Sequence, residues 1–213
     1  MDDRHPIPHP SRPDLYRRSP GKRGSLILAC LPTTYTHTQE FILLSDVLGL
    51  SLLVDSIDHP KPAHSTEGTV LGPFHSHEAQ SEPNGAQISH DPDGEPCLVV
   101  CTIKDTEGKP VEGVKIDIWE TDSKGFYDVQ YEGREGPDQR AVMSSDKEGL
   151  FWFKAIVPVP YPIPHDGPVG KLLKLLKRHC YRPSHMHFMF EKAGYDHLIT
   201  YVLPRSSCEQ LPC

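Results

Sequence analysis

Short runs of alternating hydrophobic and polar residues, separated by turn signals, fill much of the second half of the chain. Residues 97–103 are apolar and rich in β-branched side chains, and residues 114–119 alternate with a period of two. Further apolar runs cover residues 150–157 and 197–203. A period of two predicts half-buried strands, and short strands joined by turns are typical of a sandwich. We therefore predict a mainly β fold, an antiparallel β-sandwich, over residues 59–205.

Two stretches show helical periodicity instead. In residues 39–58, apolar side chains recur at helical spacings, and Gly49 weakens the middle by ~1 kcal/mol relative to alanine. One helix or two short ones are expected there, with an apolar face that needs a partner, either the sandwich or a second subunit. Residues 169–180 place leucines on one side and lysines on the other, which predicts a short helix before the histidine strand described below.

The intervening segments have the composition of loops. Residues 59–93 are rich in Pro, Gly, Ser and His, and residues 158–168 hold too many prolines for a central strand. In the first loop, the stretch T-V-L-G-P-F (69–74) is the stiffest and could form one wall of a pocket. A His-Ser-His sequence at 75–77 lies in the same loop, so solvent-exposed histidines are expected there. The second loop presents Tyr161.

Charge and composition exclude some classes of protein. The 213 residues carry a net charge of −7, and no basic excess points to a nucleic-acid partner. No apolar run is long enough to span a membrane, so we expect a soluble, cytoplasmic protein with six reduced cysteines. Residues 1–38 contain many prolines and no hydrophobic period, and are predicted to be disordered.

The first candidate for chemistry is a pair of histidines near the end of the chain. His185 and His187 alternate with Met186, Phe188 and Phe190. In a strand, residues two apart point to the same face, so both imidazoles project to one side and the three apolar side chains to the other. Two imidazoles on one face can bind a metal ion, but a half-buried strand can also carry two histidines for no chemical reason.

Two tyrosines could complete such a site. Tyr127 directly follows a turn, and Tyr161 stands in the proline-stiffened loop. Two phenolates and two imidazoles form a hard, anionic N/O donor set that suits a trivalent ion. A free phenol has a pKa of ~10, so its ionisation at neutral pH needs a strong cation nearby. Spacing alone does not select these two among the eight tyrosines.

Five stretches together resemble one protein family, the intradiol ring-cleavage dioxygenases of the fungal catechol/hydroxyquinol 1,2-dioxygenase type. The resemblance runs from about residue 39 to residue 203, and the donor-bearing positions occur in the family's order. It implies a role in the catabolism of aromatic compounds. The stretches are Q-E-F-I-L-L-S-D-V-L-G-L-S-L-L-V-D (39–55), T-E-G-T-V-L-G-P-F (66–74), G-V-K-I-D-I-W-E-T-D-S-K-G-F-Y (113–127), P-V-P-Y-P-I-P-H-D-G-P-V-G-K-L-L (158–173) and R-H-C-Y-R-P-S-H-M-H-F (178–188).

The resemblance implies a metal site and a reaction. Tyr127, Tyr161, His185 and His187 would bind one non-haem Fe(III) ion. Catechol or hydroxyquinol would be cleaved by O2 between its hydroxylated carbons, to a cis,cis-muconate-type product or maleylacetate. Tyr161 would also act as a base, and Arg182 would place its fixed positive charge over the substrate ring.

The resemblance also implies the walls of a substrate pocket. Asp55 could accept a hydrogen bond from a third hydroxyl group and so favour hydroxyquinol over catechol, whereas a surface carboxylate at a helix end is the alternative interpretation. The pocket residues would be Leu52, Asp55, Val70, Leu71, Gly72, Pro73, Phe74, Ile163, Pro164 and Arg182.

The segment 39–58 is expected to serve as a linker and to form a homodimer, with catalysis in the sandwich of residues 59–205. The chain also departs from the family. Tyr201 stands where glutamine is common, residues 206–213 form an atypical tail, and the helical region is shorter than usual. We therefore expect parts of the family's domain to be missing at both ends, with low stability and low activity for the chain as written.

Two alternatives come from other functional classes. The first is an inactive β-sandwich that has lost a competent iron site, which predicts a colourless protein without metal. The second is a zinc hydrolase that uses His185, His187 and a loop histidine, which predicts bound zinc and no tyrosinate absorption.

Overall fold

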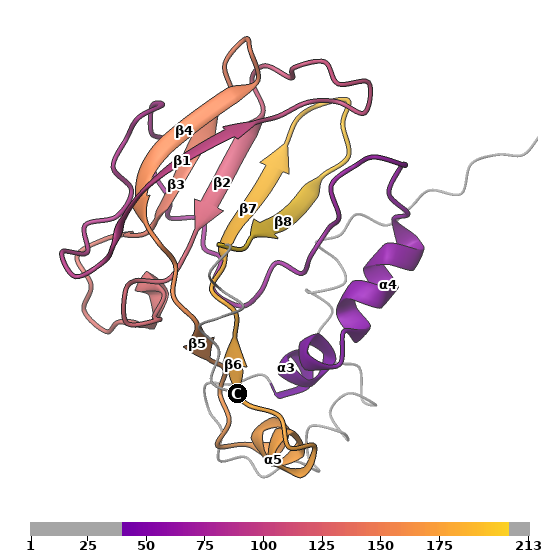
Figure 1. Ribbon diagram of the computed structural model, residues 1–213, viewed down its shortest axis with the longest axis vertical. Coiled ribbons are helices and arrows are strands. Elements are labelled where there is room, and N and C mark those ends of the chain that lie inside the picture. The colour runs from indigo at the N-terminus through magenta and orange to yellow at the C-terminus, as the bar shows by residue number, and fades with distance from the viewer. Residues whose placement is uncertain (1–39, 205–213) are drawn as a thin grey trace, which may run out of the picture. The chain divides into compact units, whose positions relative to one another are not determined.

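Two layers of antiparallel sheet form the centre of the region that the structure describes, which is residues 40–204 of a computed structural model (Figure 1). The predictions for residues 1–38 and 206–213 fall outside the described residues. One layer contains β1 and β4, and the other has the strand order β3-β2-β7-β8. The strands are β1 (Pro96–Thr102), β2 (Lys115–Trp119), β3 (Arg140–Ser144), β4 (Leu150–Ile156), β7 (Met186–Glu191) and β8 (Leu198–Val202).

An apolar core between the two layers confirms the predicted sandwich. Ile116 and Ile118 of β2 contribute to it together with Phe151 and Phe153 of β4, and Phe188 joins them from β7. All five are almost completely buried. The predicted strands correspond to β1, β2, β4, β7 and β8. Strand β3 was not predicted, because it is short and begins with Arg140, a charged residue that local sequence alone would place at the surface.

A short third sheet lies where a loop was predicted. β5 (Tyr161–Pro162) pairs with β6 (Tyr181–Arg182), and Tyr161 is the register partner of Arg182. A two-residue strand gives no periodic signal in the sequence, so the proline-rich composition dominated the prediction. The pairing brings a predicted metal ligand next to the predicted catalytic arginine.

The N-terminal segment forms two short helices, one of the two possibilities predicted. α3 (Glu40–Val47) and α4 (Leu50–Asp58) are separated at Gly49, whose φ of 70° is a left-handed conformation that glycine adopts without strain. α3 packs its apolar side chains on a second core cluster, which also contains Tyr127 and Tyr161. α4 has no buried residue.

Helix α5 (Pro168–Leu175) is shorter than the predicted 169–180, because Lys177 has a φ of 54° and cannot continue the helix. Its first turn is tied to α3, since the backbone N–H of Val169 donates to Glu40 Oε2 at 3.0 Å. None of the helices in the described region is both long and apolar enough to cross a membrane.

Candidate metal centre

Strand β7 and the residue before it carry the two histidines on one face. His185 and His187 are each 2% exposed, and their Nε2 atoms lie 3.0 Å apart. Met186 and Phe188 point to the opposite face, into the sandwich core. The predicted division of the strand into a polar and an apolar face is confirmed.

The two phenols reach the histidines from separate segments. Tyr127 lies between the turn after β2 and the 3-10 helix η1 (Asp128–Gln130), and its hydroxyl oxygen is 3.4 Å from His185 Nε2. The hydroxyl oxygens of Tyr127 and Tyr161 are 3.5 Å apart. Gly125 makes this approach possible, because a Cβ atom there would lie 3.0 Å from Tyr161 Cβ. The fold therefore brings all four predicted donors together.

A backbone contact sets the tautomer of His185. Its Nδ1 lies 2.9 Å from the carbonyl oxygen of Pro183. A carbonyl can only accept a hydrogen bond, so Nδ1 carries the hydrogen and Nε2 keeps a lone pair that faces the other donors. In contrast, His187 Nδ1 is buried and has no hydrogen-bond partner within the described residues.

The electrostatics of the site favour neutral side chains until a cation binds. Burial, reinforced by the charge of Arg182, lowers the pKa of His185 to about 4. Burial and the neighbouring His185 likewise lower the pKa of His187. Burial and the nearby Tyr161 raise the pKa of Tyr127 above its usual range. Neutral imidazoles are ready ligands, and the buried phenol can ionise only beside a strong cation, so this donor set fits a ferric ion.

Aromatic rings pack against the donors. The indole of Trp119 stacks on the His187 imidazole, with ring centroids 4.8 Å apart and an interplanar angle of 5°. The ring of Phe74 stacks on Tyr127 at 4.5 Å and 18°. Tyr201 lies 5.5 Å from His185 and 6.2 Å from His187, measured between ring centroids. This side chain therefore occupies space directly beside the imidazoles.

Arg182 lies beside Tyr161. Its NH1 group donates to the Tyr161 hydroxyl at 3.2 Å, and its guanidinium carbon is 5.9 Å from the centre of that ring. The positive charge of Arg182 also acts on Asp46 of α3, although burial is the larger influence and raises the pKa of this carboxyl group. Sequence analysis did not single out Asp46, because a carboxylate within an apolar helical pattern gives no sign of an arginine more than a hundred residues away.

The loop at 69–74 lies against the donors as a pocket wall would. A Cβ atom on Gly72, which has a φ of 77°, would be 3.9 Å from His187 Nε2. Leu71 and Phe74 pack on the cluster that contains Tyr127 and Tyr161, and Ile163 is buried in the same cluster. The other predicted wall residues of these two loops differ in exposure, with Val70 and Pro164 half-buried and Pro73 exposed.

Helix α4 places two further predicted pocket residues. Leu52 is 38% exposed, and the Asp55 carboxylate lies 3.2 Å from His59 Nδ1 on the next turn. The contacts that join the four donors come from other elements of the fold. The roles of Leu52 and Asp55 therefore stay predictions.

One loop histidine differs from expectation. The prediction of solvent exposure was wrong for His75, whose side chain is 5% exposed and whose Nε2 lies 2.9 Å from Asp117 Oδ2. The ring of His75 also packs edge-on against Trp119. The partner on β2 is 42 residues away, so the loop sequence could not reveal this burial. His77 is exposed, as expected.

The described residues do not support the zinc alternative. Residues 40–204 contain no group of three or more His, Cys, Asp or Glu side chains that could hold a metal ion. A zinc site built from His185, His187 and a loop histidine therefore lacks its third ligand in this region.

Comparisons with known proteins all point to one family of dioxygenases. The family described as "Dioxygenase" matches residues 70–205, and "Catechol dioxygenase N terminus" matches residues 29–66. An intradiol ring-cleavage dioxygenase, hqdA, of Aspergillus niger is 79% identical over 162 residues, which are 76% of this chain and 49% of that protein. A hydroxyquinol 1,2-dioxygenase of a Rhizobium species is 49% identical over 77% of this chain and 56% of its own length.

The fold agrees with these relatives. A crystal structure of hydroxyquinol 1,2-dioxygenase from Pseudomonas putida superimposes with a TM-score of 0.75 at 42% identity, covering 78% of this chain and 58% of that one. The chain thus spans about half to three fifths of the length of the relatives named here. The predicted resemblance is confirmed, and the chain belongs to the family of intradiol ring-cleavage dioxygenases.

Proposed function

We propose that this chain carries the catalytic centre of an iron-dependent intradiol dioxygenase. The substrate would be hydroxyquinol or catechol, cleaved by O2 between two hydroxylated carbons to maleylacetate or a muconate-type acid. One observation carries the proposal, namely that two buried phenols and two buried imidazoles from separate segments are linked by a series of donor-atom contacts of 3.0–3.5 Å. The names of the relatives support the same reaction.

Tyr127, Tyr161, His185 and His187 would hold one Fe(III) ion. The ion supplies Lewis acidity, which makes the electron-rich ring of a bound catechol reactive toward O2. Anionic phenolates stabilise the ferric state of such an ion. The apolar surroundings of the four donors exclude water and strengthen the electrostatic interactions within the site.

The remaining chemistry belongs to Tyr161 and Arg182. The Tyr161 oxygen, as the phenolate, would take a proton from one substrate hydroxyl group, and it is the oxygen that Arg182 contacts directly. The fixed charge of Arg182 would then stabilise negative charge that develops on the ring. Arg182 is half-buried, so its charge is only partly screened by water.

Hydroxyquinol is the proposed preferred substrate. The printed names of several relatives support this choice. In this chain, a carboxylate at Asp55 and the wall formed by residues 69–74 would distinguish a ring with a third hydroxyl group, because a missing hydrogen-bond partner is costly in a buried site.

The exposed apolar face of α4 supports a homodimer. Leu53, Val54 and Ile57 are 55%, 56% and 68% exposed. Burying such side chains contributes roughly 1.5–3 kcal/mol each. We expect a dimer in sedimentation experiments, and Leu53→Glu should dissociate it. The control is Leu175→Glu at an exposed position on α5. A monomeric wild type, or a Leu53→Glu variant that stays dimeric, contradicts this assembly.

A cytoplasmic location is also proposed. Cys97, Cys101 and Cys180 are free thiols in the described region, which suits a reducing compartment.

The reaction is tested by supplying isotope-labelled O2 and hydroxyquinol to the iron-loaded protein. We expect one O2 consumed per ring opened and both labelled atoms in the acidic product. An unopened quinone with hydrogen peroxide would instead show simple oxidation, and the proposed function would be wrong.

A further inference from the structure

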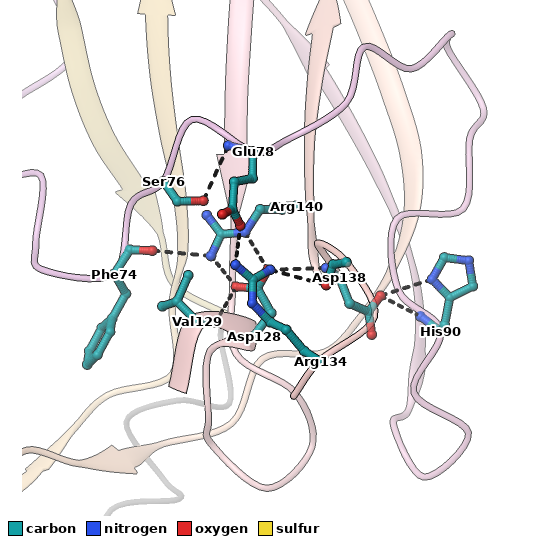
Figure 2. A network of polar contacts seen from close by, with 10 residues as sticks. Phe74, Ser76, Glu78, His90, Asp128, Val129, Arg134, Asp138 and Arg140 are labelled. Atoms are coloured by element: carbon teal, nitrogen blue, oxygen red, sulfur yellow. Dashed lines mark hydrogen bonds and ion pairs between the residues drawn. The ribbon is translucent and has the colours of Figure 1, made fainter. Parts of the chain in front are cut away.

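A buried ion pair involves the residue that directly follows Tyr127. Asp128 follows Tyr127 in the chain, and the side chains of Asp128 and Arg140 are 5% and 1% exposed. Arg140 donates from Nε to Asp128 Oδ2 at 2.8 Å and from NH2 to Asp128 Oδ1. The guanidinium thus grips both carboxylate oxygens, as Figure 2 shows. Two parallel bonds fix orientation as well as distance.

The same guanidinium also bonds to the loop that carries Phe74. The NH2 group of Arg140 donates to the carbonyl oxygen of Phe74 at 3.2 Å (Figure 2). The ring of Phe74 is the one that stacks on the Tyr127 ring. Arg140 therefore contacts both segments that border this ring, one through Asp128 and one through Phe74.

Stability alone gives a poor account of this arrangement. Removing two charges from water is costly, and apolar residues of similar size often stabilise a fold as well as a buried ion pair does. Arg140 NH1 is moreover buried without a hydrogen-bond partner in the described region. Arg140 is also the register partner of Trp119, whose indole stacks on His187. Arg140 thus contacts Phe74 and is paired with Trp119, and the rings of these two residues stack on the predicted donors Tyr127 and His187.

A second arginine provides a natural control. Arg134 NH1 also approaches Asp128 Oδ2, at 3.2 Å, and Arg134 pairs with Glu78 (Figure 2). Its side chain is 23% exposed, and its remaining described hydrogen bond goes to the carbonyl oxygen of Gly136. Arg134 thus shares the carboxylate with Arg140 but is not bonded to Phe74.

We propose that Arg140 is a positioning residue, which fixes the Tyr127 phenol and the Phe74 ring in one arrangement so that metal ligand and pocket wall stay in register. This inference rests on the proposed function, in which Tyr127 is an iron ligand. Without Arg140, Tyr127 would still be present, but the orientation of its phenol toward the metal would no longer be fixed. Partners of metal ligands typically change metal affinity or activity roughly 10–100-fold when they are removed.

The test compares Arg140→Gln, Arg140→Lys and Arg134→Gln in the full iron-loaded chain. The readouts are the visible tyrosinate-to-iron absorption, iron affinity by chelator competition, and KM separately from kcat. For Arg140→Gln we expect a shifted absorption band, roughly 10-fold or more weaker iron binding and a raised KM. For Arg134→Gln we expect wild-type values for all of these readouts.

Arg140→Lys keeps the test valid if the glutamine variant does not fold. A lysine keeps the charge but cannot donate in the planar, two-bond manner of a guanidinium, so it should show part of the same shift. The inference is overturned if the folded variant, with either substitution, keeps the wild-type band, iron affinity and KM. It is also overturned if Arg134→Gln changes them equally, because the pair would then be a structural ion pair only.

Failure of the proposed function would give a different result. If the wild-type protein binds no iron, the readout becomes the NMR contacts between the rings of Phe74 and Tyr127 in the metal-free protein. Loss of these contacts in Arg140→Gln, but not in Arg134→Gln, still supports positioning. Their full retention overturns it.

Discussion

The two faces of strand β7 show how one short segment can support both folding and chemistry. On one face, Met186 and Phe188 belong to the apolar core between the sheets. On the other, His187 lies in a region of phenols and imidazoles and has a buried nitrogen without a described partner. Burial favours the first face by about 1.5–3 kcal/mol for each large side chain, whereas an unsatisfied buried polar group costs about 1–3 kcal/mol. The apolar face therefore stabilises the site that the polar face forms.

The largest effect on stability is expected from Phe188→Ala. This substitution opens a cavity in the sandwich core and should lower the free energy of unfolding by about 3–5 kcal/mol. Urea denaturation measures the change. The matched substitution on the other face, His187→Asn, should reduce stability much less while it abolishes iron binding. Equal destabilisation by both variants would remove the distinction between the faces.

Arg182→Ala tests the chemistry of the polar face. The variant should bind iron normally but lose roughly 10²-fold in kcat, the typical cost of removing one charge-stabilising donor. Steady-state kinetics with hydroxyquinol measure the effect. Arg178→Ala is the control, because Arg178 is exposed and only four residues away. If the two variants turn over substrate equally fast, Arg182 has no role in the reaction.

Glu120 is a buried carboxyl group that should make the stability of the fold depend on pH. This residue follows β2, is 1% exposed, and has a pKa raised by burial. Between the pKa of Glu120 in the unfolded chain and its raised pKa in the folded protein, only the folded state keeps the proton. The free energy of unfolding therefore falls as pH rises through this range. Glu120→Gln should be more stable than wild type by on the order of 1 kcal/mol near pH ~8, with no difference near pH ~4. Thermal melts across this range measure it, and a constant difference would refute the raised pKa.

The smallest effect is expected from Asp55→Ala. Loss of one hydrogen bond to a third hydroxyl group, worth about 0.5–1.5 kcal/mol, should narrow the preference for hydroxyquinol over catechol several-fold. The ratio of kcat/KM for the two substrates measures it. Asp58→Ala, an exposed position on the same helix, should leave the ratio unchanged. A wild-type preference for catechol that persists in Asp55→Ala contradicts the prediction.

The local part of this structure could be predicted from the sequence. Period-two alternation identified β2 and β7, apolar runs between turns identified β1, β4 and β8, and Gly49 indicated the break between α3 and α4. The family resemblance supplied the four donors, which the fold then brings together. Spacing alone gave only the two histidines, because the tyrosines come from segments far apart in the chain.

The parts that were missed depend on contacts between distant residues. The burial of His75 depends on Asp117, and the burial of Arg140, which begins β3, depends on Asp128. A charged residue in isolation is expected at the surface, because burial is tolerable only with a partner. Neither partner can be identified from local sequence patterns.

The central claim is that Tyr127, Tyr161, His185 and His187 form one ferric site, and the visible spectrum of the iron-reconstituted protein tests it most directly. We expect one iron ion per chain and a red-brown colour from tyrosinate-to-iron charge transfer, with a band that shifts or bleaches in Tyr127→Phe. A colourless wild-type protein that takes up no iron, or a band that Tyr127→Phe leaves unchanged, would contradict the account.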